Sequence, residues 1–329
     1  MRKEFEYKNH LCDIEHVVSK LVIGTENAIK NPLVSVLMPI YNHPDFFRKS
    51  LLSVLNQKCD FEYEVVIVDN CHPDFQVKNQ KIVEELFCER IRYYINEENI
   101  GGVGSENRGA QLAKGQYITY CHDDDMLTQD ALQILIDWNN RLSNVNSAIF
   151  GNLISIDETD SPIRGYDEWE SLFLKRKNIY IISIYDFMEK NYTNGCGALY
   201  CREKFLEIGG FNSDYIPCPD YALNVKYTSL FGSYAIRDIT LNYRISQQSD
   251  SSSAFRYLVE ANKKIYDNLL KSGFISKFYP YLLVKSNLAC RYYYLYSRWA
   301  EKPTGFSYYI YRVIFRIWLT LLLMWRTLR

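Results

Sequence analysis

The sequence predicts an α/β fold: a mostly parallel, doubly wound sheet flanked by helices, with a C-terminal helical extension. Between residues 33 and 120, short apolar runs of strand length alternate with segments of helical spacing. Polar residues follow the ends of several of these runs, at the edge where open α/β sheets bind ligands. The chain has 329 residues, of which 47% are hydrophobic, so a packed core is expected.

The first half contains four predicted strands and three predicted helices. The strand segments are short apolar runs of the kind found in sheets buried on both faces. The first helix repeats large apolar residues, such as Phe47, Leu51 and Leu55, on one face. The strands are Leu33–Met38, Glu64–Val68, Ile91–Ile95 and Gln116–Tyr120, and the helices are Phe46–Gln57, Gln76–Glu89 and Ser105–Ala113.

The pattern is less regular after residue 130. It predicts strands at Ser147–Ile156 and Gly195–Tyr200 and helices at Ala131–Arg141 and Lys204–Ile208. We divide the chain into a polar helical lead-in (1–31) ended by Asn31-Pro32, one domain (32–253) and a helical region (254–329).

Composition narrows the class of protein. Lysine plus arginine (38) nearly cancels aspartate plus glutamate (39), which argues against a nucleic-acid partner. The nine cysteines are scattered and form no Cys-x-x-Cys pair, which predicts reduced thiols and argues against structural zinc. The N-terminus has no apolar signal-peptide core, so we expect a cytoplasmic protein.

Three consecutive aspartates, Asp123, Asp124 and Asp125, follow the fourth strand. Adjacent carboxylates repel one another and need a compensating charge. A divalent cation with hard oxygen ligands, Mg²⁺ or Mn²⁺, supplies it and can stabilise a diphosphate leaving group. The alternative is an acidic loop that caps the helix near Thr128.

Several segments occur with these aspartates in a characteristic order. They are Val34–Asn42, Val65–Asn70, Asn99–Gly109, the aspartates, Ile208–Asn212 and Pro219–Leu223. In this order they resemble glycosyltransferase family 2, an inverting family with the GT-A fold, over roughly residues 33–250. The resemblance implies a nucleotide-binding half at about 32–127 and an acceptor half at about 128–253.

The resemblance also implies an activity. This activity is the metal-dependent transfer of a hexosyl or related glycosyl group to an acceptor hydroxyl. The donor is a nucleotide-diphosphate sugar of the UDP-sugar class. The expected acceptor is a saccharide or a lipid-linked saccharide. The expected pathway is the synthesis of a cell-surface polysaccharide such as O-antigen or capsule. The implied site residues are Pro39, Tyr41, Asp69, Asn99, Gly101, Asn107 and Asp123 for the nucleotide, Asp124 and Asp125 for the metal, and Asp220 for catalysis.

Two registers of the acidic run remain open. Met126-Leu127 favours Asp124 as the metal ligand, with His122 in place of the family's usual first acid, whereas the other register puts Asp125 on the metal. His122 either faces the nucleotide or is a hydrogen-bonded structural histidine.

Asp220 is the candidate catalytic base, because inverting transfer needs one carboxylate to take the proton of the attacking hydroxyl. The family usually has Glu-Asp there, and Pro219 replaces the Glu. The alternative role of Asp220 is to cap the helix that begins near Tyr221. Two further departures are Glu106, where the family often carries Arg, and Ser246, where many members have His.

The segment Gly101–Gly104 is expected to be a loop whose backbone can approach a ligand closely. It follows the third strand, so it is not a Rossmann dinucleotide fingerprint, which follows the first.

Residues 307–329 combine aromatic and aliphatic residues with a narrow polar stripe, which predicts a helix at the inner membrane surface. The alternative is a helix packed on the domain or in a dimer. Two other functions stay open: an inactive sugar-nucleotide-binding protein of GT-A fold, and a sugar-1-phosphate nucleotidyltransferase.

Overall fold

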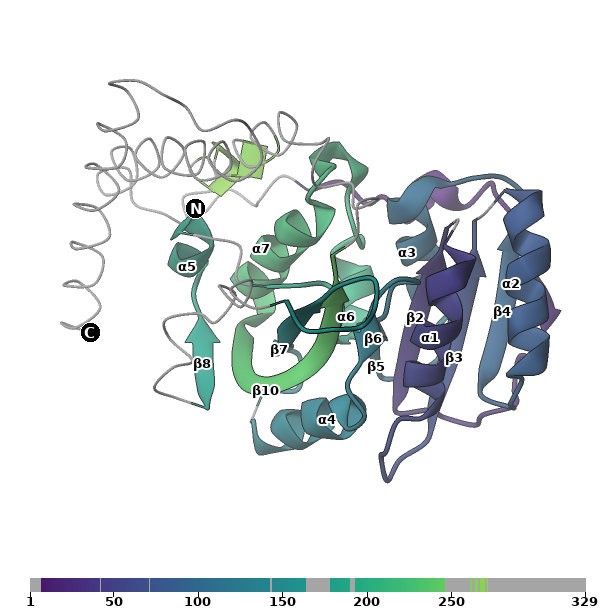
Figure 1. The fold of residues 1–329 in the computed structure, drawn as a ribbon. Helices are drawn as coiled ribbons and strands as arrows, with labels where there is room; N and C mark the ends of the chain where they lie inside the picture. The colour runs from purple at the N-terminus through teal and green to yellow at the C-terminus, as the bar shows by residue number, and fades with distance from the viewer. Residues whose placement is uncertain are drawn as a thin grey trace, which may run out of the picture.

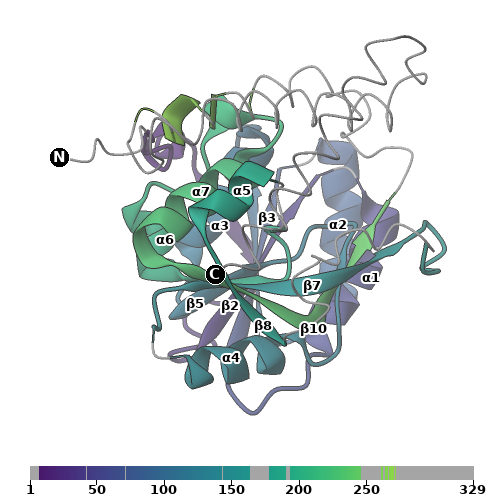
Figure 2. The ribbon, with the colours of Figure 1, turned by 90° about the vertical axis from the view of Figure 1, so that its left-hand side faces the viewer.

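A ten-stranded mixed sheet forms the centre of the protein, and helices cover both of its faces (Figures 1 and 2). The computed structural model describes residues 7–245 except 42, 71, 143, 164–177 and 190–192, and further along the chain only 261, 264–265, 267–269 and 271. The strands are β1 (Ser19–Ile23), β2 (Val34–Ile40), β3 (Tyr63–Asp69), β4 (Ile91–Asn96), β5 (Tyr117–Tyr120), β6 (Met126–Leu127), β7 (Ala148–Ile156), β8 (Ile179–Ile182), β9 (Ala198–Cys201) and β10 (Ser233–Arg244). The helices are α1 (Pro44–Leu55), α2 (Pro73–Glu85), α3 (Gly101–Leu112), α4 (Ala131–Arg141), α5 (Ile184–Glu189), α6 (Arg202–Glu207) and α7 (Pro219–Phe231), with short 3₁₀ turns η1 (Cys12–Ile14) and η2 (Ser213–Tyr215).

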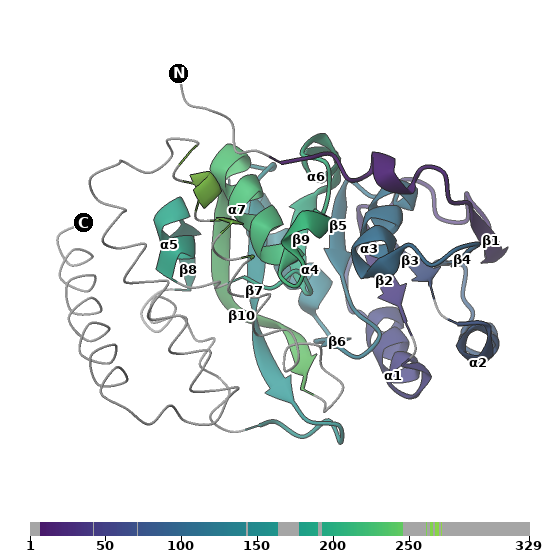
Figure 3. The ribbon, with the colours of Figure 1, turned by 90° about the horizontal axis from the view of Figure 1, so that it is seen from above.

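The first half of the sheet is parallel. Strands β4, β3, β2 and β5 are neighbours in that order. Ile40 of β2 pairs with Asp69 of β3, and Asp69 pairs with Ile95 of β4, so the carboxyl ends of these strands meet at one edge. Helices α1 and α2 lie on one face of this half and α3 on the other (Figure 3). The predicted doubly wound architecture is confirmed here.

The strands of this half are apolar because both of their faces are covered. All seven residues of β3 are buried, and in β2 only Pro39 is partly exposed. Continuous apolar runs are typical of parallel strands packed between two helical layers. The predicted strands and helices of this half therefore appear with shifts of only a few residues at their ends.

The second half of the sheet is mixed. β9 is antiparallel to both β5 and β7, β7 is parallel to β10, and β6 and β8 are antiparallel to β10. Helices α4 and α7 lie on opposite sides of β7 and β10 (Figures 1 and 2). The twelve-residue β10 was not predicted, because its register with β7 shifts on either side of Ile239. Such bulges break the period-two alternation that reveals a strand in a sequence.

The predicted helical lead-in is wrong for the part of residues 1–31 that the structure describes. Residues 7–31 contain only the single turn η1 and the strand β1, which pairs antiparallel with β4. Ser19 Oγ donates to Asn96 Oδ1 at 2.6 Å beside this pairing. Without β1, backbone groups along the edge of β4 would be unpaired. A local sequence pattern does not reveal such an edge, so the pairing was not predicted.

Residues 7–17, here called the N-terminal strap, connect the two halves of the domain. Tyr7 donates its hydroxyl to the Gly210 carbonyl at 2.8 Å. Arg108 of α3 donates to the carbonyls of Ile14 and Val17, both at 2.6 Å. The strap therefore contacts the segment before α7 at one end and the parallel half at the other.

In the described part of the 254–329 region, every residue is helical, and Ala261, Ile265 and Leu269 are buried at a spacing of four. The tail helix expected at 307–329 lies outside the described residues, and so does most of this region. No helix among the described residues is long and apolar enough to cross a bilayer. The seven described cysteines are all free.

Replacing Gly210 by alanine should destabilise the fold. Gly210 has φ +68°, and an added Cβ would lie 2.3 Å from Asn107 Oδ1. We expect a loss of roughly 1–3 kcal/mol in the free energy of unfolding, measured with urea. The control is Gly102→Ala, whose Cβ meets no atom within 4 Å and which should change stability by less than about 1 kcal/mol. Equal effects of the two substitutions would contradict this assignment of strain.

Candidate active site

The three aspartates form a short loop, here called the acid loop, between β5 and β6. Asp123 and Asp125 are buried, whereas Asp124 is partly exposed. Tyr41 donates its backbone N–H to Asp123 Oδ2 at 2.7 Å, and Arg244 donates its backbone N–H to Asp125 Oδ1 at 2.9 Å. The turn after β2 and the end of β10 therefore converge on this loop.

Polar side chains on α1 and just after its end hold the backbone that follows β5. Ser50 Oγ lies within hydrogen-bonding distance of the carbonyl oxygens of Asp123 and Asp125. Ser53 Oγ accepts the Leu127 N–H at 3.1 Å, and Gln57 donates its amide to the Thr128 carbonyl at 2.7 Å. These three residues were not among the predicted site residues. The sequence feature that could have revealed them is their helical spacing, which puts three polar side chains on one face of a predicted helix.

Arg244 is the largest fully buried side chain among the residues that the structure describes, and it also supports the acid loop. Its Nε donates to the Asp124 carbonyl at 2.8 Å and its Nη1 to the Asp157 carbonyl at 2.6 Å. Its Nη2 forms an ion pair with Asp160 at 2.6 Å. The guanidinium thus binds the backbone of the acid loop, while its charge is paired with a carboxylate outside it.

The electrostatics of the acid loop favour a cation. Burial, and then the charge of Asp124, raises the pKa of Asp123 well above its usual value. The same two causes raise the pKa of Asp125 from 3.8 to about 7. Among the residues that the structure describes, no lysine or arginine forms an ion pair with these three carboxylates, and Asp125 Oδ2 has no hydrogen-bond partner. The residues present therefore fit the divalent cation that the sequence predicts.

The residues predicted to contact the nucleotide base differ in accessibility. Pro39 is partly exposed at the end of β2, and Tyr41 is 49% exposed beside the acid loop. Asp69 is fully buried at the end of β3, where its Oδ2 accepts from Tyr93 at 2.5 Å and from Asn79 at 3.1 Å. A nucleotide contact by Asp69 stays a prediction.

The prediction of a loop at Gly101–Gly104 is wrong. These residues form the first turn of α3. Asn99 Oδ1 accepts the Gly101 N–H at 2.8 Å and the Asn70 side-chain amide at 2.7 Å. Gly101 has φ +72°, and an added Cβ on Gly101 or Gly102 would meet no atom within 4 Å. The start of the helix is therefore open, and a helix N-terminus suits anions.

The Asn107 side chain is bound to the protein backbone at Phe211. It is buried, its amide nitrogen donates to the Phe211 carbonyl at 2.9 Å, and its amide oxygen accepts the Phe211 N–H at 2.8 Å. Both polar atoms of the side chain are thus used within the protein, which argues against the predicted nucleotide contact. Asn107 instead fastens α3 to the segment that leads to α7.

Asp220 lies in the first turn of α7, after Pro219, and is partly exposed. A Cβ on Gly195 would lie 3.7 Å from the Asp220 Cβ. The next residue, Cys196, forms an isolated bridge with Tyr120, the last residue of β5 before the acid loop. The segment Gly195–Cys196 therefore lies next to both the first turn of α7 and the end of β5, and the helix N-terminus stabilises negative charge on Asp220.

His122 is hydrogen-bonded, with Nε2 3.0 Å from Glu106 Oε1. The partial removal of the His122 imidazole from water opposes a charge on it, but nearby Cys196 and Glu106 outweigh this effect and raise the His122 pKa well above its usual value. The structure therefore places a histidine–carboxylate pair beside the acid loop. Glu106 stands where the family often has Arg, and His122 where it usually has an acid, so the two signs of charge are exchanged.

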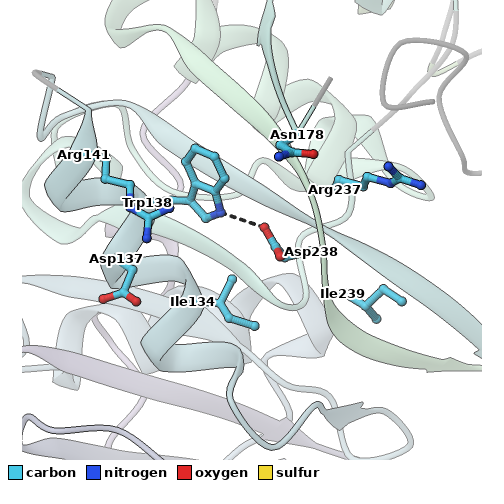
Figure 4. A pocket seen from close by; sticks show the side chains of 8 residues that line it. All are labelled: Ile134, Asp137, Trp138, Arg141, Asn178, Arg237, Asp238 and Ile239. Carbon is cyan, nitrogen blue, oxygen red and sulfur yellow. Dashed lines mark hydrogen bonds between the residues drawn. The ribbon is translucent and has the colours of Figure 1, made fainter. Parts of the chain in front are cut away.

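A separate cavity of about 570 Å³ lies between α4 and β10 (Figure 4). Trp138 donates its indole N–H to Asp238 at 2.8 Å within it, and the Arg141 guanidinium lies 5.2 Å from the Trp138 ring centre. None of the predicted site residues lines this cavity.

The sequence profile of glycosyl transferase family 2 matches residues 35–209, just over half of the chain. An uncharacterized glycosyltransferase of Rickettsia felis is 27% identical over 232 residues, which are 70% of this chain and 37% of that protein. The putative colanic acid biosynthesis glycosyl transferase WcaA of Escherichia coli is 35% identical over 106 residues, 32% of this chain and 37% of WcaA. The chain thus spans little more than a third of the length of these relatives.

Among solved structures, S. aureus TarS (residues 1–349), crystallised with UDP-GlcNAc, aligns with a TM-score of 0.58 and 15% identity. The alignment covers 81% of this chain and 73% of TarS. The chain belongs to glycosyl transferase family 2. With the shared fold, this confirms the predicted family and its GT-A architecture.

The metal-free protein should lose stability as the pH rises. The pKa of Asp125 is about 7 in the folded state and 3.8 ordinarily, so the folded state binds one more proton between these values. Stability is therefore lost as the pH rises through this window. Asp125→Asn keeps the oxygen that accepts the Arg244 N–H but cannot titrate. Between about pH 5 and about pH 8, the free energy of unfolding of this variant should therefore fall by at least about 1.4 kcal/mol less than that of the wild type.

Urea unfolding in the presence of a chelator measures this difference. The exposed Asp60 provides the control Asp60→Asn, which should follow the wild type. An Asp125→Asn variant with the same pH dependence as the wild type would show that this carboxyl titrates normally.

Proposed function

We propose that the protein is an inverting glycosyltransferase that moves a sugar from a nucleotide-diphosphate donor, UDP-sugar by class, to an acceptor hydroxyl. The observation that carries the proposal is the acid loop at the end of β5, with the segment Gly195–Cys196 lying next to both Asp220 and Tyr120, the last residue of β5. Family membership supports the reaction class. The complex of TarS with UDP-GlcNAc supports the donor class.

Asp124 is the proposed ligand of Mg²⁺ or Mn²⁺, because it is the most accessible of the three acids. Asp125 is less suited to an exposed donor complex, since it is buried and binds the Arg244 N–H. The cation, when bound, stabilises the negative charge of the departing diphosphate. Tyr41 and Pro39 provide partly exposed apolar surface beside this loop for the base of the donor.

Asp220 is the proposed general base. The acceptor oxygen forms a bond to the anomeric carbon, the bond from that carbon to the phosphate oxygen breaks, and the nucleoside diphosphate leaves with the electron pair. The proton of the acceptor hydroxyl passes to the Asp220 carboxylate. Attack from the face opposite the leaving group inverts the anomeric centre.

Synthesis of a cell-surface polysaccharide is the proposed pathway class, supported by the likeness to the colanic acid transferase. A saccharide or lipid-linked saccharide is the proposed acceptor. Contact of residues 307–329 with the inner membrane surface would bring the enzyme to a lipid-linked acceptor. That segment lies outside the described residues, and the contact stays a prediction.

Asp220→Asn should separate binding from transfer. We expect UDP affinity within about twofold of the wild type and a transfer rate lower by roughly 100-fold or more, because a general base contributes roughly 10²–10⁴-fold. Asp214→Asn, a neighbouring exposed carboxylate, is the control and should retain activity. Radiolabelled transfer from a panel of UDP-sugars is the measurement, and near-normal rates in Asp220→Asn would remove this residue from the mechanism.

Asp124→Asn should weaken the metal-dependent binding of UDP by at least about tenfold. Calorimetric titration of UDP, with Mn²⁺ or with a chelator, measures this effect. Asp130→Asn, an exposed change just beyond the acid loop, should bind UDP normally. If the wild type bound no nucleotide with Mn²⁺, the enzyme proposal itself would fail. If it bound nucleotide but transferred no sugar, an inactive binding protein would be favoured.

A further inference from the structure

A histidine, an aspartate and a cysteine meet at the acid loop. The ligand atoms of His122, Asp125 and Cys196 all lie within 4.8 Å of one another. The first two belong to the segment after β5, whereas Cys196 precedes β9. The Gly197 N–H donates to the Tyr120 carbonyl at 2.9 Å, and this bond holds the two segments together.

The aspartate of this group has an unused buried oxygen. Asp125 is 1% exposed and its Oδ1 accepts the Arg244 N–H, while its Oδ2 has no nitrogen or oxygen partner; the neighbouring Cys196 thiol is the group of this cluster that interacts with the carboxylate. A buried carboxylate oxygen without a partner is costly. A cation bound here would provide the missing partner.

The histidine is oriented as metal-binding histidines usually are. Its Nε2 lies 3.0 Å from Glu106 Oε1, and a metal-bound imidazole usually donates its second ring N–H to a carboxylate or carbonyl. With Nε2 turned to Glu106, Nδ1 is the nitrogen left for a metal. The His122 side chain is 40% exposed, so an ion can reach the group from solvent.

The ligand set indicates which cation fits. Sulfur, imidazole nitrogen and one carboxylate oxygen are typical ligands of Zn²⁺, whereas Mg²⁺ prefers oxygen alone. We propose that His122, Asp125 and Cys196 form a binding site for a thiophilic divalent cation of the Zn²⁺ class. This site is separate from the oxygen site at Asp124 and does not depend on glycosyl transfer. On binding, the Cys196 thiol and the His122 imidazolium each release a proton to solvent, and so does Asp125 where it is protonated. The sulfur, the freed ring nitrogen and the carboxylate oxygen then bond the metal.

Co²⁺ titration of the full chain, first treated with a chelator and a thiol-free reductant, tests the site. We expect a thiolate-to-cobalt charge-transfer band in the near ultraviolet that added Zn²⁺ removes. Loss of a residue that only supports a metal ligand weakens metal affinity by roughly 10- to 100-fold. Cys196→Ser should therefore abolish the band and weaken Co²⁺ binding by at least about tenfold.

Cys201→Ser is the matched control, because Cys201 is also buried and lies at the far end of β9. It should retain the band. Asp124→Asn should also retain it, which distinguishes this site from the proposed donor metal. If Cys196→Ser does not fold, His122→Gln replaces it, with the same expected loss of affinity. A wild type without the band, or a band that survives both Cys196→Ser and His122→Gln, would overturn the proposal.

Discussion

Repulsion among three adjacent carboxylates at the end of β5 is the constraint on which the candidate site depends. The protein does not relieve it with a lysine or arginine paired to these carboxylates, as far as the described residues extend. Instead Ser50 and Arg244 bind backbone carbonyls of the acid loop, and Tyr41 and Arg244 donate backbone N–H groups to Asp123 and Asp125. These contacts fix the shape of the loop and leave its negative charge available to a cation.

The positive charge of Arg244 is paired with a carboxylate outside the acid loop. Its ion pair with Asp160, which also binds Lys49 at 2.6 Å, keeps a buried guanidinium from neutralising the acid loop. Glu106 and His122 form a second pair of opposite charge beside the acid loop, 3.0 Å apart. This pair also places an imidazole, rather than a carboxylate, next to Cys196.

The position of α7, and with it Asp220, depends on contacts between segments far apart in the chain. Asn107 fastens α3 to Phe211, and Tyr7 of the N-terminal strap binds Gly210. The Tyr7 ring also stacks on Tyr215, with centroids 6.1 Å apart. The backbone that precedes α7 is therefore held from two sides, which positions the first turn of that helix.

The sequence by itself determined the parallel half of the sheet, because buried strands appear as continuous apolar runs and their helices as periodic faces. It also determined that Asp69 and the acid loop share one edge, since strand ends in such a sheet must meet there. Only the tertiary structure decided that residues 19–23 pair with β4, that β10 continues through its bulges and that Gly101 begins a helix. It alone brought Ser50, Arg244 and Cys196 to the acid loop. The physical reason is that strand edges and buried polar partners are completed by residues distant in sequence, and no local pattern of hydrophobicity records them.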